Sequence, residues 1–295
     1  MEYYLDNQER IKLLDLPFAK YFALQEYQIA EKGIERAYQF GYSHWYVDFS
    51  LPSEALTTWT SERITQLAHL ISTYCVYPIF HGNFKAPLAS DLEELRVAAV
   101  AYTKKEIDIA AKFSAPLILH AGGIVEPRLV KQVKQKALEN FLLSLYELVE
   151  YACSRGVKLW VENLSNYTKN HPFYYIFTTP SEFDYILSNC CEVDFFMDIG
   201  HANVGNGDVN SLLTTFHNRI IGLSLSNNNG VRDQHLSLFH GNLNYKELIT
   251  TLCNLNWKGY IGIEVRDQTP SETLTDLQKL YHSGSNELLE KCTTA

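Results

Sequence analysis

Three acidic residues end strongly apolar runs of the sequence: Glu162, Asp198 and Glu264. A charged carboxylate buried in such surroundings destabilises the fold unless it is paired or bound to a cation. Four histidines stand at or just after the ends of similar runs, at positions His81, His120, His201 and His235. Carboxylate oxygens together with imidazole nitrogens form a ligand set suited to divalent ions such as Zn²⁺, Mn²⁺ or Fe²⁺.

Two short spacings strengthen the metal interpretation. Asp233 and His235 are two residues apart, so both side chains point to one side if that loop is extended. Asp198 and His201 are three apart, which lets one strand end serve two adjacent sites. A lone histidine there is more often a hydrogen-bonded core residue, and a lone buried glutamate is more often a salt-bridge partner. The interpretation therefore rests on such residues recurring at six strand ends.

The elements that must position these residues alternate along the whole chain. Short apolar, β-rich runs alternate with longer amphipathic runs, which is typical of a parallel α/β fold. The predicted strands are Tyr21–Leu24, Trp45–Phe49, Val76–Phe80, Pro116–His120, Lys158–Glu162, Phe195–Asp198, Ile220–Leu225 and Tyr260–Val265. The helical patterns that follow them are Gln28–Phe40, Ser61–Tyr74, Asp91–Phe113, Lys134–Ser154, Pro180–Ser188, Asn210–Phe216, Tyr245–Leu255 and Ser271–Leu280.

This pattern predicts a single (β/α)8 TIM barrel, with residues 1–295 as one domain. Barrels of this kind run to about 250 residues, and their active sites form at the C-terminal ends of the strands. A doubly wound open sheet could also hold eight strands, but no Gly-rich phosphate loop follows the first predicted strand. Pro and Gly are not concentrated in any linker.

Composition narrows the classes of partner. The formal net charge of −9 repels phosphate backbones, so nucleic acid is an unfavourable partner. No apolar run is long enough to span a membrane, and the first residues lack the pattern of a signal peptide. The six cysteines form no C-x-x-C pair, as expected for reduced thiols. We therefore expect a cytoplasmic protein without a membrane partner; a homo-oligomer is left open.

The chain resembles the xylose isomerase-like TIM barrel superfamily, in its sugar phosphate isomerase/epimerase and endonuclease IV-related group. The most specific matches are Asp198-Ile199-Gly200-His201-Ala202-Asn203 and Asp233-Gln234-His235-Leu236. The matching segments, in family order, are Pro78–Phe84, Ile118–Gly123, Leu159–Leu164, Phe196–Asn203, Leu223–Tyr245 and Gly259–Val265. The resemblance places metal-binding residues at His81, His120, Glu162, Asp198, His201, Asp233, His235 and Glu264.

One position departs from the family pattern. The family carries a metal-binding histidine after its seventh strand, and here Ser224 stands in that place. Neutral serine is a weak ligand, so the central site of Glu162, Asp198 and Glu264 loses a strong donor. We therefore expect metal at one or both of two outer groups. These groups are His81, His120 and Glu162, and His201, Asp233 and His235.

The resemblance implies a metal-dependent isomerase or epimerase acting on a small sugar or cyclitol. In such enzymes a divalent ion (Zn, Mn, Mg or Fe) holds the substrate oxygens, while carboxylates matching Glu162 and Glu264 transfer a proton next to a carbonyl. A related lyase or dehydratase would begin with the same proton loss. The expected contacts to the small polar substrate are Trp45, Phe84, Asn163, Arg232 and Arg266.

Two alternatives stay open. An endonuclease IV-like phosphodiesterase would keep the metal residues but would need DNA-binding loops rich in Arg and Lys. A metal-poor relative could bind a ligand without turnover, or be a biosynthetic enzyme of divergent chemistry. Ser224 motivates that second alternative. An abasic-site cleavage assay isolates the first alternative, and a metal assay isolates the second.

Overall fold

The computed structural model describes residues 16–167, 173–205 and 207–293, and for residues 284–293 only the backbone. Within these ranges, eight parallel strands close into a barrel in the order β1-β10-β9-β8-β6-β4-β3-β2. The strands are β1 (Ala19–Leu24), β2 (His44–Asp48), β3 (Tyr77–His81), β4 (Leu117–His120), β6 (Leu159–Glu162), β8 (Asp194–Asp198), β9 (Ile220–Leu225) and β10 (Gly259–Ile263). The predicted closed barrel is confirmed, and the open-sheet alternative is wrong.

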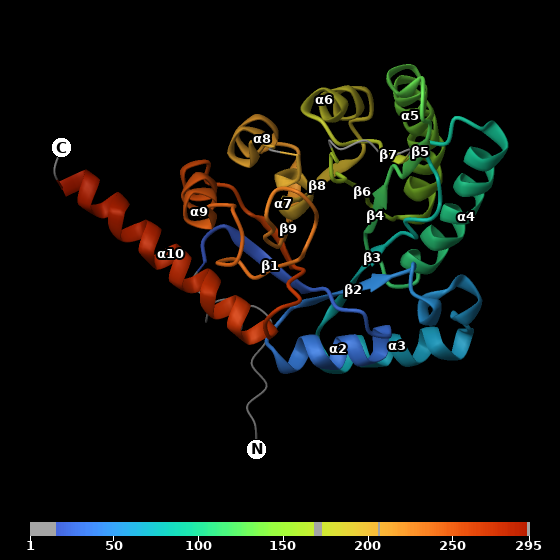
Figure 1. The fold of residues 1–295 in the computed structure, drawn as a ribbon. Coiled ribbons are helices and arrows are strands. Elements are labelled where there is room, and N and C mark those ends of the chain that lie inside the picture. Colours follow the sequence, from blue (N-terminus) through green and yellow to red (C-terminus); the bar gives the residue numbers. More distant parts are fainter. Residues whose placement is uncertain (1–15, 168–172, 206, 294–295) are drawn as a thin grey trace.

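Helices surround the barrel on its outside (Figure 1). The long ones are α2 (Ala30–Gln39), α3 (Ser61–Tyr74), α4 (Glu93–Ala111), α5 (Val130–Arg155), α6 (Pro180–Asn189), α8 (Val209–Phe216), α9 (Tyr245–Asn254) and α10 (Pro270–Thr293). A short helix, α7 (Ile199–Asn203), directly follows β8, and two 3₁₀ turns, η1 (Pro52–Glu54) and η2 (Leu56–Thr58), precede α3. In the described part of the chain, no helix combines the length and apolarity that crossing a membrane requires.

One apolar layer fills the inside of the barrel. Its buried members are Ala23, Tyr46, Ile79, Ile118, Trp160 and Phe196, each from a different strand. Trp160 stacks on Phe196, with ring centroids 5.6 Å apart. The long Tyr46 side chain fits because β10 offers only a glycine there: a Cβ on Gly262 would lie 2.7 Å from the Tyr46 hydroxyl oxygen. Because strand side chains alternate, the residue two positions further along each strand points into the mouth.

A larger core lies between the strands and the helices. Trp45 belongs to this outer core and is 0% exposed. It lies against α2, where a Cβ on Gly33 would fall 1.9 Å from the indole ring. The expectation that Trp45 contacts substrate is therefore wrong, because the alternation along β2 turns Tyr46 and Asp48 inward and Trp45 outward.

Two loops at the C-terminal end of the barrel pair into a small antiparallel ribbon. Strand β5 (Gly123–Val125) follows β4, and strand β7 (Phe173–Tyr175) follows β6. Gly123 pairs with Tyr175, and Val125 pairs with Phe173. The ribbon lies beside the ends of β4 and β6 (Figure 1). It therefore forms a fixed wall on one side of the mouth.

Candidate metal centre and active site

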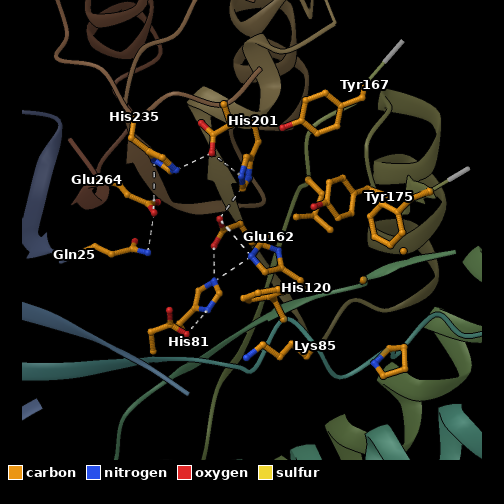
Figure 2. A pocket seen from close by; sticks show the side chains of 18 of the residues that line it. Gln25, His81, Lys85, His120, Glu162, Tyr167, Tyr175, His201, His235 and Glu264 are labelled. Carbon is orange, nitrogen blue, oxygen red and sulfur yellow. Dashed lines mark hydrogen bonds and ion pairs between the residues drawn. The ribbon is translucent and has the colours of Figure 1, made fainter. Parts of the chain in front are cut away.

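A ring of polar residues forms the mouth of the barrel, two positions beyond the apolar layer on each strand. Its members are Gln25, Asp48, His81, His120, Glu162, Asp198, Ser224 and Glu264. His201 joins from the short helix α7, and Asp233 and His235 join from the loop after β9; with most of the ring they line a cavity of about 640 Å³. Figure 2 shows the labelled histidines and glutamates converging on this cavity. Active sites of TIM barrels form at this end of the strands.

The first group of possible metal ligands joins β3, β4 and β6. His81 Nε2 lies 3.0 Å from His120 Nε2. Glu162 faces both rings, with Oε2 at 3.7 Å from His81 Nε2 and Oε1 at 3.9 Å from His120 Nε2. The ligand atoms of these three buried residues lie within 4.8 Å of one another. Two imidazole nitrogens and a carboxylate meeting in this way form a donor set that fits a divalent ion.

Asp48 fixes the orientation of the first histidine. Its Oδ1 lies 3.7 Å from His81 Nδ1, on the opposite side of the ring from His120. A carboxylate on the second ring nitrogen is the usual partner of a metal-binding histidine, because it sets the tautomer and leaves the other nitrogen free. Asp48 was missed in the sequence, although it lies within the predicted strand Trp45–Phe49, two residues after Tyr46.

The second group is centred on Asp233. Its Oδ2 lies 2.7 Å from His235 Nε2 and 3.6 Å from His201 Nε2. His201 Nδ1 also comes within 4.8 Å of Glu162 and Asp198, which offers another grouping. However, His201 Nδ1 lies 2.9 Å from the backbone carbonyl oxygen of Asn163, so Nδ1 carries the hydrogen and donates it in a hydrogen bond to that oxygen. The lone pair then belongs to Nε2, so we assign His201 to the Asp233 group.

Asn163 is a structural link rather than a substrate contact. Its side chain is fully buried. It accepts a hydrogen bond from the Asp198 backbone N–H at 2.8 Å and donates one to the Asp198 carbonyl at 3.0 Å. Asn163 therefore ties β6 to β8 and orients His201. The expectation that its side chain touches substrate is wrong.

Glu264 follows β10 and accepts hydrogen bonds from residues at both neighbouring strands, β1 and β9. Gln25 donates to its Oε1 at 3.0 Å, and Ser224 donates to its Oε2 at 3.4 Å. Ser224 is 1% exposed and pairs in register with Asp198 on one side and Gly262 on the other. The structure thus directs Ser224 at the central carboxylates, where it supplies a hydroxyl in place of an imidazole.

Burial shapes the protonation of the site. It raises the pKa of Glu162 to about 8 and also raises the pKa of Glu264 above its usual value. Burial lowers the pKa of His120 well below its ordinary value. For His81 burial has the same tendency, but the nearby Asp48 carboxylate and the charge of Glu162 outweigh it and raise the pKa to about 9. Neutral His120 keeps a free lone pair, and the buried carboxylates need protons or cations.

Two buried carboxylate oxygens of the site lack the partners that a metal ion would supply. Asp198 Oδ2 and Asp233 Oδ1 have no hydrogen-bond partner among the described residues. A buried polar atom without a partner costs about 1–3 kcal/mol, and more if it is charged. Divalent ions would compensate for that cost, so the donor set fits them.

Of the other residues expected to contact substrate, some line the cavity and one does not. Phe84 and Arg266 line the cavity. Arg232 is exposed and lies outside the residues that line it, so the expectation for Arg232 is wrong. Its loop turns the side chain to solvent while Asp233 and His235 turn inward. The cavity also contains Tyr27, Lys85, Tyr167 and Tyr175, which the sequence did not indicate because they lie between the predicted strands and helices.

Comparison with known proteins agrees with this architecture. The sequence profile of the family described as xylose isomerase-like TIM barrel matches residues 34–282. The chain is 28% identical over 222 residues to the uncharacterized protein MJ1311 of Methanocaldococcus jannaschii, covering 72% of this chain and 73% of that one.

Two solved structures show the same fold. A D-tagatose 3-epimerase-like protein is 24% identical, with a TM-score of 0.75, over 91% of this chain and 99% of the other. An AP endonuclease of family 2 from Brucella melitensis is 18% identical, with a TM-score of 0.65, over 88% of this chain and 98% of the other.

Proposed function

Because the chain belongs to the xylose isomerase-like TIM barrel family, we propose that it is a metal-dependent isomerase or epimerase of a small sugar or cyclitol. The observation that carries this proposal is the pair of buried glutamates, Glu162 and Glu264, in the same cavity as a His81–His120 ligand pair. Proton transfer next to a carbonyl needs a base, an acid and stabilisation of the developing oxyanion. These residues can supply all three.

The two glutamates differ in their surroundings, as an acid and a base should. Burial raises the pKa of Glu162 to about 8, so without an ion its carboxyl keeps a proton near neutral pH, and a bound ion would displace that proton and leave a carboxylate. Glu264 receives hydrogen bonds from Gln25 and Ser224, which hold its two oxygens in place. A divalent ion bound by His81, His120 and Glu162 would polarise the substrate carbonyl. One carboxylate would take the proton from the carbon next to the carbonyl, and the carboxyl of the other would donate its own proton to the opposite face of that carbon.

The names of structural relatives support a sugar-like substrate. One solved structure of the same fold is called D-tagatose 3-epimerase-like, and another is a D-psicose 3-epimerase determined with D-tagatose. A cavity of about 640 Å³ with many polar lining residues can hold a substrate of this size. Zn, Mn, Mg and Fe all remain proposals for the metal.

Solvent exchange tests the proposed reaction directly. The metal-loaded protein is incubated in D₂O with ketohexoses and inososes, and proton NMR follows deuterium entry at the carbon next to the carbonyl. We expect exchange with the wild type and none with Glu162→Gln or Glu264→Gln. The replacement His240→Asn, at an exposed histidine outside the cavity, is the matched control. Absence of exchange with every substrate would refute the proposal.

One observation favours phosphodiester hydrolysis as a second candidate. Proton transfer needs a single metal group, yet the mouth also holds the group of His201, Asp233 and His235. Two or more adjacent ions can stabilise both the attacking and the leaving oxygen of a phosphodiester. The net charge of −9 disfavours a DNA substrate. Cleavage of abasic-site DNA by the metal-loaded protein would support this candidate over the first.

A further inference from the structure

The cavity continues beyond the metal-binding residues into a second compartment. His120 ends β4, and the next cavity residues along the chain are Gly122 and Gly123. Neither glycine has a side chain, and the Phe173 ring occupies the space that a side chain on Gly123 would need. Beside the glycines stand the aromatic residues Phe173 and Tyr175. We call this region, floored by Gly122–Gly123 and walled by Phe173 and Tyr175, the aromatic compartment.

The ribbon geometry makes the compartment a built feature. Gly123 pairs with Tyr175, and a Cβ on Gly123 would lie 2.6 Å from Phe173 Cζ and 2.8 Å from the Tyr174 carbonyl oxygen. Only glycine therefore lets the Phe173 ring lie over this strand. Alternation along β7 sends Phe173 and Tyr175 to the cavity, while Tyr174 packs on the outer core.

The aromatic rings of the compartment contact one another, and part of the Phe173 ring stays exposed. The Phe173 and Tyr175 rings meet edge to face with centroids 4.9 Å apart, and the Tyr167 ring lies 6.1 Å from that of Tyr175. Figure 2 shows Tyr167 and Tyr175 on the opposite side of the cavity from Gln25 and Glu264. Phe173 is still 38% exposed. An aromatic surface held open in a cavity favours a ligand that covers it.

The cavity thus has two chemically different halves. One half carries carboxylates and imidazoles, and the other carries ring faces and glycine backbone. Neither β5 nor β7 contains a charged residue, so this half has no ribbon group to hold a phosphate. The cations that line the cavity, Lys85 and Arg266, come from other loops. A flat, uncharged group is therefore the ligand that fits the aromatic compartment.

We propose that the aromatic compartment binds a second ring, joined by a glycosidic bond to the sugar held at the metal-binding half. The reacting sugar keeps its carbonyl and carries the second ring on one of its hydroxyls, so the substrate is a substituted sugar rather than a free monosaccharide. This inference rests on the proposed function, since it takes the metal-binding half as the site of the reacting sugar. It specifies the class of substrate: a sugar carrying an uncharged aryl or carbohydrate substituent.

Matched pairs of glycosides test the inference by binding alone. Affinities of the Mn²⁺-loaded protein for phenyl and methyl β-D-glucopyranoside, and for the same pair of galactopyranosides, are measured by titration calorimetry. Saturation-transfer NMR then reports whether the phenyl protons touch the protein. We expect phenyl to bind about tenfold or more tightly than methyl within at least one pair, as burial of an aromatic ring predicts.

Variants within the ribbon make the test specific. Tyr175→Ala and Phe173→Ala should each reduce the phenyl-to-methyl preference toward unity by weakening phenyl glycoside binding. Val125→Ala is the control, because Val125 lies on the same ribbon but is 73% exposed and is not among the residues that line the cavity. Thermal unfolding checks that each variant is folded. If one aromatic replacement prevents folding, the other still tests the inference.

Equal affinity of phenyl and methyl glycosides in both pairs, absence of binding by all four, or a preference that survives both aromatic replacements overturns the inference. Tighter binding of a sugar phosphate than of any phenyl glycoside, lost in Lys85→Ala or Arg266→Ala, also overturns it. Failure of the proposed function is a separate result, since it appears as absent deuterium exchange in free ketohexoses and inososes, whereas the methyl and phenyl glycosides have no carbonyl and report binding alone.

Discussion

Replacing Ser224 by histidine should create the nitrogen donor that the central carboxylates lack. Ser224 pairs with Asp198 and Gly262, and its hydroxyl lies 3.4 Å from Glu264 Oε2. An imidazole at this position would face Asp198 and Glu264. Loss of a single residue that merely orients a ligand changes metal affinity by about 10–100-fold. A residue that binds the metal directly should change the affinity by at least the same factor, so we expect total metal affinity at pH 7.5 to rise by about 10–100-fold.

The gain should depend on pH with a defined sign. Imidazole binds metal only when neutral, and its ordinary pKa is about 6.5. Below about pH 6 each further unit should remove about tenfold of the gain, so wild type and Ser224→His should converge near pH 5. The new ring also enters a position that is 1% exposed. We therefore expect the metal-free variant to lose about 1–3 kcal/mol of stability by overpacking.

Competition with a chromophoric chelator measures this difference between pH 5 and 8. Ser224→Asn is the matched control, because its amide has similar bulk but a weaker donor. Equal affinities of wild type and Ser224→His across the whole range, with both proteins folded, would refute the reasoning. That result would mean that another group, such as the nearby imidazole of His235, already fills the place.

Three further predictions concern residues around the mouth and the base of the barrel. Tyr46→Phe should stabilise the metal-free protein by about 1 kcal/mol in thermal unfolding, because the buried hydroxyl has no hydrogen-bond partner among the described residues; a loss of stability would show that a water molecule bonds it. Burial lowers the pKa of His44 to about 3, so its folded form stays neutral. The contribution of His44 to the free energy of unfolding should be fully present above pH 6.5. It should be lost as pH drops from 6.5 toward 3, by up to about 5 kcal/mol. His44→Gln should flatten that fall in denaturant titrations, whereas His69→Gln, at an exposed site on α3, should not. Asp48→Asn should weaken metal binding by about 10–100-fold in the chelator assay, because His81 loses its orienting partner; unchanged affinity would assign Asp48 another role.

The barrel could be predicted from sequence because each strand is a short apolar run with a distinctive end. The run before Glu162 and the run before Asp198 fall within a residue of β6 and β8. The direction of individual side chains was harder to predict. Strands of a barrel are buried on both faces, so the Trp45-Tyr46-Val47 run at the middle of β2 is continuously apolar and gives no sign that Trp45 faces out.

The ribbon could not be predicted, for a different physical reason. Its strands are three residues each, at Gly123–Val125 and Phe173–Tyr175, and they pair across nearly fifty residues of intervening chain. No local periodicity marks so short a strand. The aromatic compartment therefore emerged only from the structure. The assignment of residues 1–295 to one domain, the cytoplasmic location and a homo-oligomer stay predictions.

The role of Glu162 is the most direct test of the central claim, since this one carboxylate both faces His81 and His120 and is proposed to transfer the proton. The measurement is the divalent metal content of wild type and Glu162→Gln, by elemental analysis after purification without chelator, with solvent exchange followed on the same samples. We expect bound metal in the wild type, less metal in Glu162→Gln, and no exchange by the variant despite an intact fold. Unchanged metal content and exchange in Glu162→Gln would contradict the claim.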